Sequence, residues 1–262
     1  MRIIRQLIGI VTIALVAIAF IVGDIWGRIS VELAGRWWPG RYEQRLRDHV
    51  RRMRRTTLFI LRHVGRARID IAPVIPCRGG ILVVMNHQSL IDIPVGCEMV
   101  PDGYPRFVTH VRYAKGIPSV SHVIRMIRAI AVHPGHTGAR DLELLQEAGR
   151  TSEHPIILYP EGHRTSDGEI RRWKRGALDA FLSARAWTIH VVVIDGLWNS
   201  ARIPAFIRTI TTVRCRVESA GVFEYDGRAA ASHDELVDRL HAAMCDKLSE
   251  MRRPARSGTR AA

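Results

Sequence analysis

The chain begins with a long apolar run, and short apolar segments alternate with polar helical stretches after it. Leu7–Val22 contains sixteen residues without a charge. With its apolar flanks, the run approaches the ~20 residues that cross a bilayer as a helix. Tryptophans follow at positions typical of interfacial anchors: Trp26, Trp37 and Trp38. We therefore expect a membrane anchor helix over residues 1–27, either spanning the membrane or embedded in it.

Two alternatives to the anchor are a secretory signal peptide and a buried helix of a soluble domain. The basic start MRIIRQ favours a signal peptide, but the run is long for one and Gly23-Asp24-Ile25 is a poor cleavage site. Two arginines precede the run, whereas twelve follow it by residue 68. The positive-inside rule therefore predicts that the bulk of the chain lies on the cytoplasmic face of the inner or plasma membrane.

Residues 41–64 have the pattern of an amphipathic helix with a basic face. Apolar residues recur at helical spacing: Tyr42, Leu46, Val50, Met53, Ile60 and Val64. Arginines occupy much of the remainder: Arg41, Arg45, Arg47, Arg51, Arg52, Arg54, Arg55 and Arg62. Such a helix suits an anionic leaflet, which makes residues 28–68 a basic interfacial segment. The alternative is a helix packed on the domain with a solvated basic face.

Beyond residue 66 the pattern predicts an α/β domain, with a mixed sheet flanked by helices over residues 69–252. The expected strands are Ile81–Met85, Arg106–Thr109, Ala129–Val132, Ile156–Tyr159, Ile189–Ile194 and Thr211–Val217. The expected helices are Ile91–Val100, Val120–Ile127, Gly138–Gly149, Gly176–Ala186 and His233–Glu250. The polar tail 253–262 is expected to be disordered.

Charge and composition narrow the functional classes. The net charge is +14, and residues 1–68 alone hold +10, so the basic excess is local. Aromatic residues are 6% and do not interleave with the basic run, which argues against nucleic-acid binding. The four cysteines form no CxxC pair, and no HxxxH or HExxH spacing occurs, so we expect neither a disulfide framework nor a metal site.

Candidate chemistry first appears directly after the predicted strand ILVVM. His87 and Asp92 lie in Asn86–Asp92, where a carboxylate can orient an imidazole that takes up a proton. The spacing alone is weak evidence, because five His–x4–Asp pairs occur in the chain. Only this pair spans a strand-to-helix turn, where a bend can bring the two side chains together.

A second candidate segment follows the predicted strand IILY. It contains Glu161, Gly162, His163 and Arg164 and leads into Trp173–Ala177. A glycine permits close backbone approach, and a guanidinium binds phosphate through two donors, so this turn is a plausible anion site. Without further context, the favoured interpretation of this segment is an ordinary surface turn.

Together the two segments resemble the glycerolipid acyltransferase family, specifically the 1-acylglycerol-3-phosphate acyltransferases. Asn86–Asp92 resembles the NHx4D block, Pro160–Arg164 the PEGTR block and Trp173–Ala177 the FKxGA block. Weaker similarity includes Lys115, where the family has a lysine before a helix. The departures are His163 for Thr, Trp173 for Phe, His133 for a strand-terminal Arg, and His190-Val191-Val192 for Val-Pro-Val.

The resemblance implies direct acyl transfer from acyl-CoA or acyl carrier protein to a membrane lysophospholipid, with no cofactor. His87 is then the general base and Asp92 its orienting partner. Arg164, the Gly162 backbone and Lys115 would hold the acceptor phosphate, with Glu161 bracing that site. The expected acceptor is 1-acyl-sn-glycerol-3-phosphate. A different lysolipid acceptor, or a non-catalytic protein that binds anionic membranes, remains the alternative.

Overall fold

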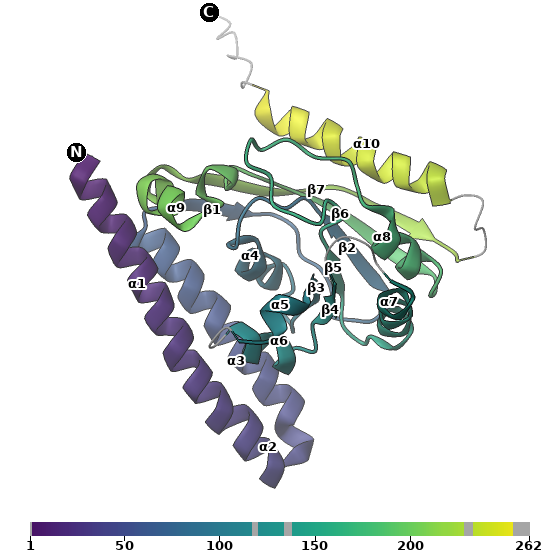
Figure 1. Cartoon of the computed structure of the whole chain (residues 1–262), viewed down its shortest axis with the longest axis horizontal. Helices are drawn as coiled ribbons and strands as arrows, with labels where there is room; N and C mark the ends of the chain where they lie inside the picture. Colours follow the sequence, from purple (N-terminus) through teal and green to yellow (C-terminus); the bar gives the residue numbers. More distant parts are fainter. Residues whose placement is uncertain (1, 117–119, 134–137, 228–232, 254–262) are drawn as a thin grey trace, which may run out of the picture.

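The computed structural model describes residues 2–116, 120–133, 138–227 and 233–253, so the predicted tail lies almost wholly outside the described residues (Figure 1). The strands are β1 Arg68–Ile71, β2 Ile81–Met85, β3 Arg106–His110, β4 Ile130–Val132, β5 Ile156–Leu158, β6 Trp187–Asp195 and β7 Arg214–Tyr225. The α-helices are α1 Arg2–Gly27, α2 Ala34–Trp37, α3 Tyr42–Phe59, α4 Asp92–Glu98, α5 Val111–Ala114, α6 Val120–Met126, α7 Ala139–Thr151, α8 Arg175–Leu182, α9 Ile203–Thr209 and α10 His233–Arg252.

The strands form one seven-stranded mixed sheet in the order β1-β7-β6-β2-β5-β3-β4. Every neighbouring pair is parallel except β6 and β7, which are antiparallel. Helices cover both faces, α3, α4, α6 and α9 on one and α7, α8 and α10 on the other (Figure 1). The predicted fold class, a mixed sheet flanked by helices, is confirmed.

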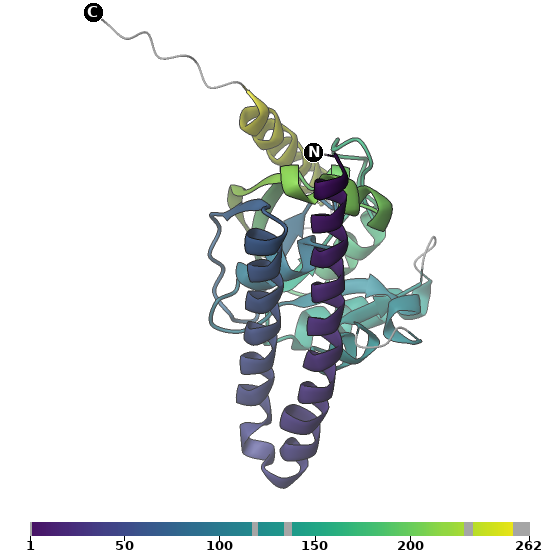
Figure 2. The same cartoon turned by 90° about the vertical axis from the view of Figure 1, so that its left-hand side faces the viewer.

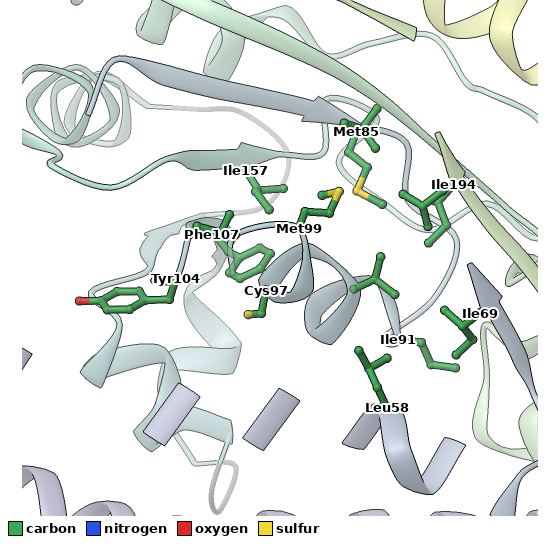
Figure 3. Packing of buried hydrophobic residues seen from close by; sticks show 14 of the residues in the cluster. Leu58, Ile69, Met85, Ile91, Cys97, Met99, Tyr104, Phe107, Ile157 and Ile194 are labelled. Carbon is green, nitrogen blue, oxygen red and sulfur yellow. The ribbon is translucent and has the colours of Figure 1, made fainter. Parts of the chain in front are cut away.

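The central strand β2 shows why the sheet is buried on both faces. Ile81, Val83 and Met85 belong to one hydrophobic cluster, and Leu82 and Val84 belong to the other. Alternate residues of a strand point to opposite faces, so an uninterrupted apolar strand contributes to two cores. Figure 3 shows the first cluster, with α4 packed between the sheet and α3.

The sheet differs from the sequence prediction at one edge. The edge strand β1 was not expected, because only Ile69 of its four residues is fully buried and Arg68 and Asp70 are polar. Strand β7 continues to Tyr225, eight residues beyond the predicted end, because it pairs with β6 along its length. Exposed polar residues alternate along β1 and along the second half of β7, so neither segment shows as an apolar run in the sequence.

The N-terminal helix is longer than the 27 residues predicted for an anchor. Helix α1 continues through a π-helical turn, Arg28–Leu33, into α2, giving one helix over Arg2–Trp37. Its mean hydropathy is 2.6 in the most apolar window, so by length and composition it is able to cross a membrane. Helix α3 returns antiparallel beside it, and the pair forms a hairpin along one side of the domain (Figure 2).

One side of α1 is exposed and apolar, and the other side packs on the domain. Exposed residues include Ile3, Ile4, Leu7, Ile10, Val11, Ile18, Ile21, Val22 and Ile25. The inner side carries small residues: a Cβ on Gly9 would lie 2.1 Å from the carbonyl oxygen of Ile207 in α9, and Thr12 is fully buried. Close backbone approach therefore seats α1 against α9.

Helix α3 directs its apolar stripe into the protein. Leu46, Val50 and Leu58 are buried and belong to the core cluster beneath α3. Arg54, one of the predicted basic-face residues, is also buried and donates to the carbonyl of Val100 at 3.0 Å. The stripe thus matches the alternative of a packed helix, whose other arginines form the basic face.

Three histidines that are buried or half-buried predict a stability that depends on pH. Burial lowers the pKa of His190 in β6, and likewise lowers the pKa of His49 and of His154. Such a histidine is protonated more readily in the unfolded chain, so its contribution is present above pH ~6.5 and is lost as the pH falls below that value. We expect urea unfolding in detergent to show a free energy that decreases by up to ~1.4 kcal/mol per pH unit per histidine.

His190→Val is expected to reduce this slope between pH 7.5 and 5. Equal slopes in the wild type and His190→Val would contradict the prediction.

Candidate active site

The start of the turn after β2 is fixed by the side chain of Asn86, which contacts the neighbouring strand β6. The Asn86 side chain donates to the carbonyl of Ile194 at 2.9 Å and accepts from the Ile194 N–H at 2.8 Å. A side-chain amide thus continues the pairing of β2 and β6 by one step beyond the strand. His87 therefore leaves the sheet at a defined position and direction.

His87 and Asp92 meet across the turn between β2 and α4, as predicted. His87 Nδ1 lies 2.6 Å from Asp92 Oδ2, and Asp92 is fully buried. The same oxygen accepts the N–H groups of Gln88 at 2.7 Å and Ser89 at 2.9 Å. These two donors fix the carboxylate, and a proton on Nδ1 directed to it leaves Nε2 as the basic nitrogen. The His87 side chain is 18% exposed, so a substrate can reach it.

Tyr159 stacks against the imidazole ring of His87, a contact that the sequence motifs did not indicate. The two rings stack with centroids 4.3 Å apart, and the phenol donates to the backbone carbonyl of Asp92 at 3.3 Å. Burial raises the pKa of Tyr159, which keeps the phenol neutral. An aromatic residue at the end of the strand beside β2 was the available signal, because neighbouring parallel strands end at the same edge.

Glu161 joins the two motifs through backbone contacts. Its buried carboxylate accepts the N–H of His87 at 3.0 Å and the N–H of Arg171 at 2.9 Å. Thr165 in turn donates its N–H to the His87 carbonyl at 2.9 Å. Burial raises the pKa of Glu161, while the hydrogen bonds from Arg171 and His87 oppose that increase. Glu161 thus braces the His87 backbone, whereas the sequence had assigned it to the phosphate site.

Gly162 and Arg164 lie on the turn that Glu161 anchors. Gly162 has φ +71°, a left-handed conformation that favours glycine, and it is exposed. Half-buried Arg164 donates to the carbonyl of Ala201, which sets the direction of its guanidinium. Lys174 lies against Gly162, with its Nζ 3.3 Å from the position that a Cβ on Gly162 would occupy, and adds a cation that the sequence prediction had not singled out.

Lys115 is placed apart from these groups. It follows α5, beyond the carboxyl end of β3, and its side chain is exposed. Within the described part of the chain, no hydrogen bond or ion pair joins it to Glu161, Gly162 or Arg164. Its assignment to the phosphate site therefore stays a prediction.

The departures from the motifs have definite structural places. His163 is exposed on the turn, with Nδ1 2.9 Å from the Glu161 carbonyl oxygen. Trp173 is buried and packs edge-on against His241 of α10, with ring centroids 5.2 Å apart. His133 follows β4 and accordingly ends the strand where an arginine was expected; its N–H donates to Asp141 at 2.9 Å. Only His163 among these three lies next to the candidate anion site.

A buried carboxylate that orients a histidine, beside a cationic turn at the carboxyl end of a mostly parallel sheet, defines a general-base site for an anionic substrate. Comparison with known families then identifies the chemistry. Residues 66–195, about half of the chain, match the family model described as Acyltransferase. The chain belongs to this family and is an acyltransferase.

The whole chain is also similar in structure to a solved enzyme. The crystal structure of the 1-acyl-sn-glycerophosphate (LPA) acyltransferase PlsC from Thermotoga maritima matches with a TM-score of 0.73. The match covers 98% of this chain and 100% of that one, at 18% sequence identity. At that identity the likeness establishes the shared fold, including the N-terminal helices. A search of curated proteins finds no significant match.

Proposed function

We propose that the enzyme transfers a fatty acyl group from acyl-CoA or acyl carrier protein to the free hydroxyl of 1-acyl-sn-glycerol-3-phosphate, giving phosphatidic acid. The observation that carries the proposal is the hydrogen-bonded link between the His87–Asp92 pair and the turn bearing Arg164. These hydrogen bonds fix the position of the base, His87, relative to Arg164, the residue proposed to bind the phosphate. The structurally similar enzyme from Thermotoga maritima is a 1-acyl-sn-glycerophosphate acyltransferase, which supports the same acceptor.

The proposed reaction needs no covalent enzyme intermediate. His87 Nε2 accepts the proton of the acceptor hydroxyl as its oxygen attacks the carbonyl carbon of the thioester. The tetrahedral intermediate collapses, the C–S bond breaks, and the thiolate takes the proton from the imidazolium. Asp92 stabilises the imidazolium throughout, because its carboxylate faces Nδ1. Arg164 pairs with the acceptor phosphate and so sets the distance from the hydroxyl to the base.

An acceptor panel tests the proposal. Purified full-length protein in detergent micelles is offered lysophosphatidate, lysophosphatidylcholine, lysophosphatidylethanolamine and a lyso-aminolipid, each with acyl-CoA and with acyl carrier protein. We expect phosphatidic acid as the main product. A larger kcat/KM with another lysolipid than with lysophosphatidate would identify that lysolipid as the acceptor. Absence of product in every combination, with vesicle binding intact, would instead support the non-catalytic membrane-binding alternative.

His163 is expected to influence which headgroup is accepted. It is exposed beside Arg164, where the related motif has the smaller threonine. We expect His163→Thr to change the ratio of kcat/KM between lysophosphatidate and lysophosphatidylcholine by ~3–10-fold, because one side chain at a pocket is worth ~1 kcal/mol. The two acceptors are offered in competition. An unchanged ratio of their kcat/KM values would show that His163 does not influence the choice of acceptor.

We also propose that the exposed face of α1 and the basic face of α3 hold the enzyme on the cytoplasmic leaflet, where anionic lipid attracts arginine. Ile18 of α1 is 54% exposed. Ile18→Asp is expected to weaken binding to anionic vesicles by ~100-fold, since aspartate at the centre of a membrane helix costs ~3 kcal/mol. Val222 in β7 is 55% exposed and provides the control, Val222→Asp, which should bind normally in the same sedimentation assay. Equal binding by Ile18→Asp and wild type would contradict the proposal.

A further inference from the structure

Arg252, the last residue of α10, joins two separate segments through its guanidinium, the end of β6 and the loop that contains Gly168 and Glu169. Nε and Nη2 donate to the two carboxylate oxygens of Asp195 at 3.0 and 2.9 Å. Nη1 donates to Glu169 at 2.6 Å, and Nη2 also donates to the carbonyl of Gly168 at 2.8 Å. A forked pair with one carboxylate, plus a second carboxylate and a carbonyl, engages the planar group on every side. Isolated surface ion pairs lack this geometry.

The loop that Arg252 contacts is built to receive it. Gly168 has φ +83°, and a Cβ there would lie 2.7 Å from Arg252 Nη2 and 2.7 Å from Trp198 Cδ1. The glycine backbone thus fits between the guanidinium and the indole with no space for a side chain. The Gly168 N–H donates to Thr165 Oγ1 at 3.2 Å. Thr165–Glu169 is therefore held in one arrangement from both sides.

Both carboxylates that Arg252 binds are connected, through hydrogen bonds or chain neighbours, to residues next to His87. Glu169 and Gly168 lie between Arg164 and Arg171, whose N–H donates to Glu161 and so supports the His87 backbone. Asp195, at the end of β6, accepts from the Gln88 side chain at 3.4 Å, and Gln88 follows His87 in the chain.

We propose that Arg252 is a positioning residue for acyl transfer, which holds the loop Thr165–Glu169 so that Arg164 meets the acceptor phosphate at the correct distance from His87. The assignment of the phosphate to Arg164 rests on the function proposed above. The His87–Asp92 hydrogen bonds come from the turn between β2 and α4, which Arg252 does not touch. Loss of Arg252 therefore affects acceptor binding before it affects proton transfer.

The kinetic test uses Arg252→Ala, Arg252→Lys and, as matched control, Arg253→Ala. Arg253 is the exposed next residue, with the same charge but outside these contacts. We expect Arg252→Ala to raise KM for lysophosphatidate ~10-fold or more with kcat within ~3-fold, since displacing a binding group by about 1 Å is costly. Lysine has no fork and restores only part of the loss. Arg253→Ala should match the wild type.

Hydrogen exchange supplies a readout that does not need a substrate. In Arg252→Ala the amides of Gly168 and Arg171 are expected to exchange at least ~10-fold faster, while those of β2 keep their protection. Wild-type KM together with wild-type exchange would overturn the proposal. So would a uniform loss of protection across the sheet, which would make Arg252 a general stabilising residue. If the wild type transfers no acyl group, the proposed function fails, and the exchange result still decides whether Arg252 holds the loop.

Discussion

Replacing His87 by alanine is expected to lower kcat for acyl transfer by ~10²–10⁴, the range that general-base catalysis contributes. The change removes the imidazole that Asp92 holds and leaves both backbone contacts of residue 87, to Glu161 and Thr165, in place. The fold and acceptor binding should therefore persist. Product formation from lysophosphatidate and acyl-CoA measures the loss, and circular dichroism with thermal melting confirms the fold.

Asp92→Asn is the companion variant to His87→Ala. The amide oxygen can still accept from the Gln88 and Ser89 N–H groups, so the turn keeps its shape. The negative charge that stabilises the imidazolium is lost, and we expect kcat to fall by ~10²-fold or more. Turnover within twofold of the wild type for His87→Ala would refute the assignment of the base, and the same result for Asp92→Asn would remove its orienting role.

Glu161→Gln is expected to reduce activity at least ~10-fold and to destabilise the protein by ~1–3 kcal/mol. Both oxygens of the buried carboxylate accept backbone N–H groups, from His87 and Arg171. An amide has one oxygen, so its NH₂ would face a buried N–H donor and leave it without an acceptor. Steady-state kinetics and urea unfolding measure the two effects on the same preparation.

Glu147→Gln provides the control for this substitution. Glu147 lies in α7, is 60% exposed and pairs with Arg150 at the surface. Exposed ion pairs contribute little, so stability and activity should stay close to the wild type. Wild-type stability in Glu161→Gln would show that the contacts to His87 and Arg171 do not hold the turn.

The sequence predicted the β2–α4 turn correctly because local and long-range signals agree there. A fully apolar strand must lie in the middle of the sheet, and a helix that starts directly after it returns Asp92 toward His87. The fold class followed from the same patterns, since apolar strands and amphipathic helices alternate along the chain. The link from Glu161 to the His87 backbone was not predictable, because no residue pattern shows which of two strand ends a carboxylate will face.

Contacts between distant segments account for most of what the sequence did not show. Arg54 looks like one of eight similar basic residues, and only the packing of α3 on α4 makes it a buried cap for the end of α4. Arg252 lies in a helix whose apolar pattern gives no reason to single out its last residue. Tyr159 belonged to a predicted strand end, yet its stacking on His87 depends on which strand pairs with β2.

The close approach of Gly9 to Ile207 gives the two sides of α1 different environments. A purely tethering segment is an interchangeable module, and any apolar sequence of similar length can replace it. In this protein the inner side of α1 packs directly against the domain and is part of its structure. Removing residues 2–27 to obtain a water-soluble enzyme would expose the sides of α9 and α3 that pack against α1. The apolar outer side of α1 would then be replaced by another exposed apolar surface. A soluble form is better sought by redesigning the outer side alone, with every small inner residue retained.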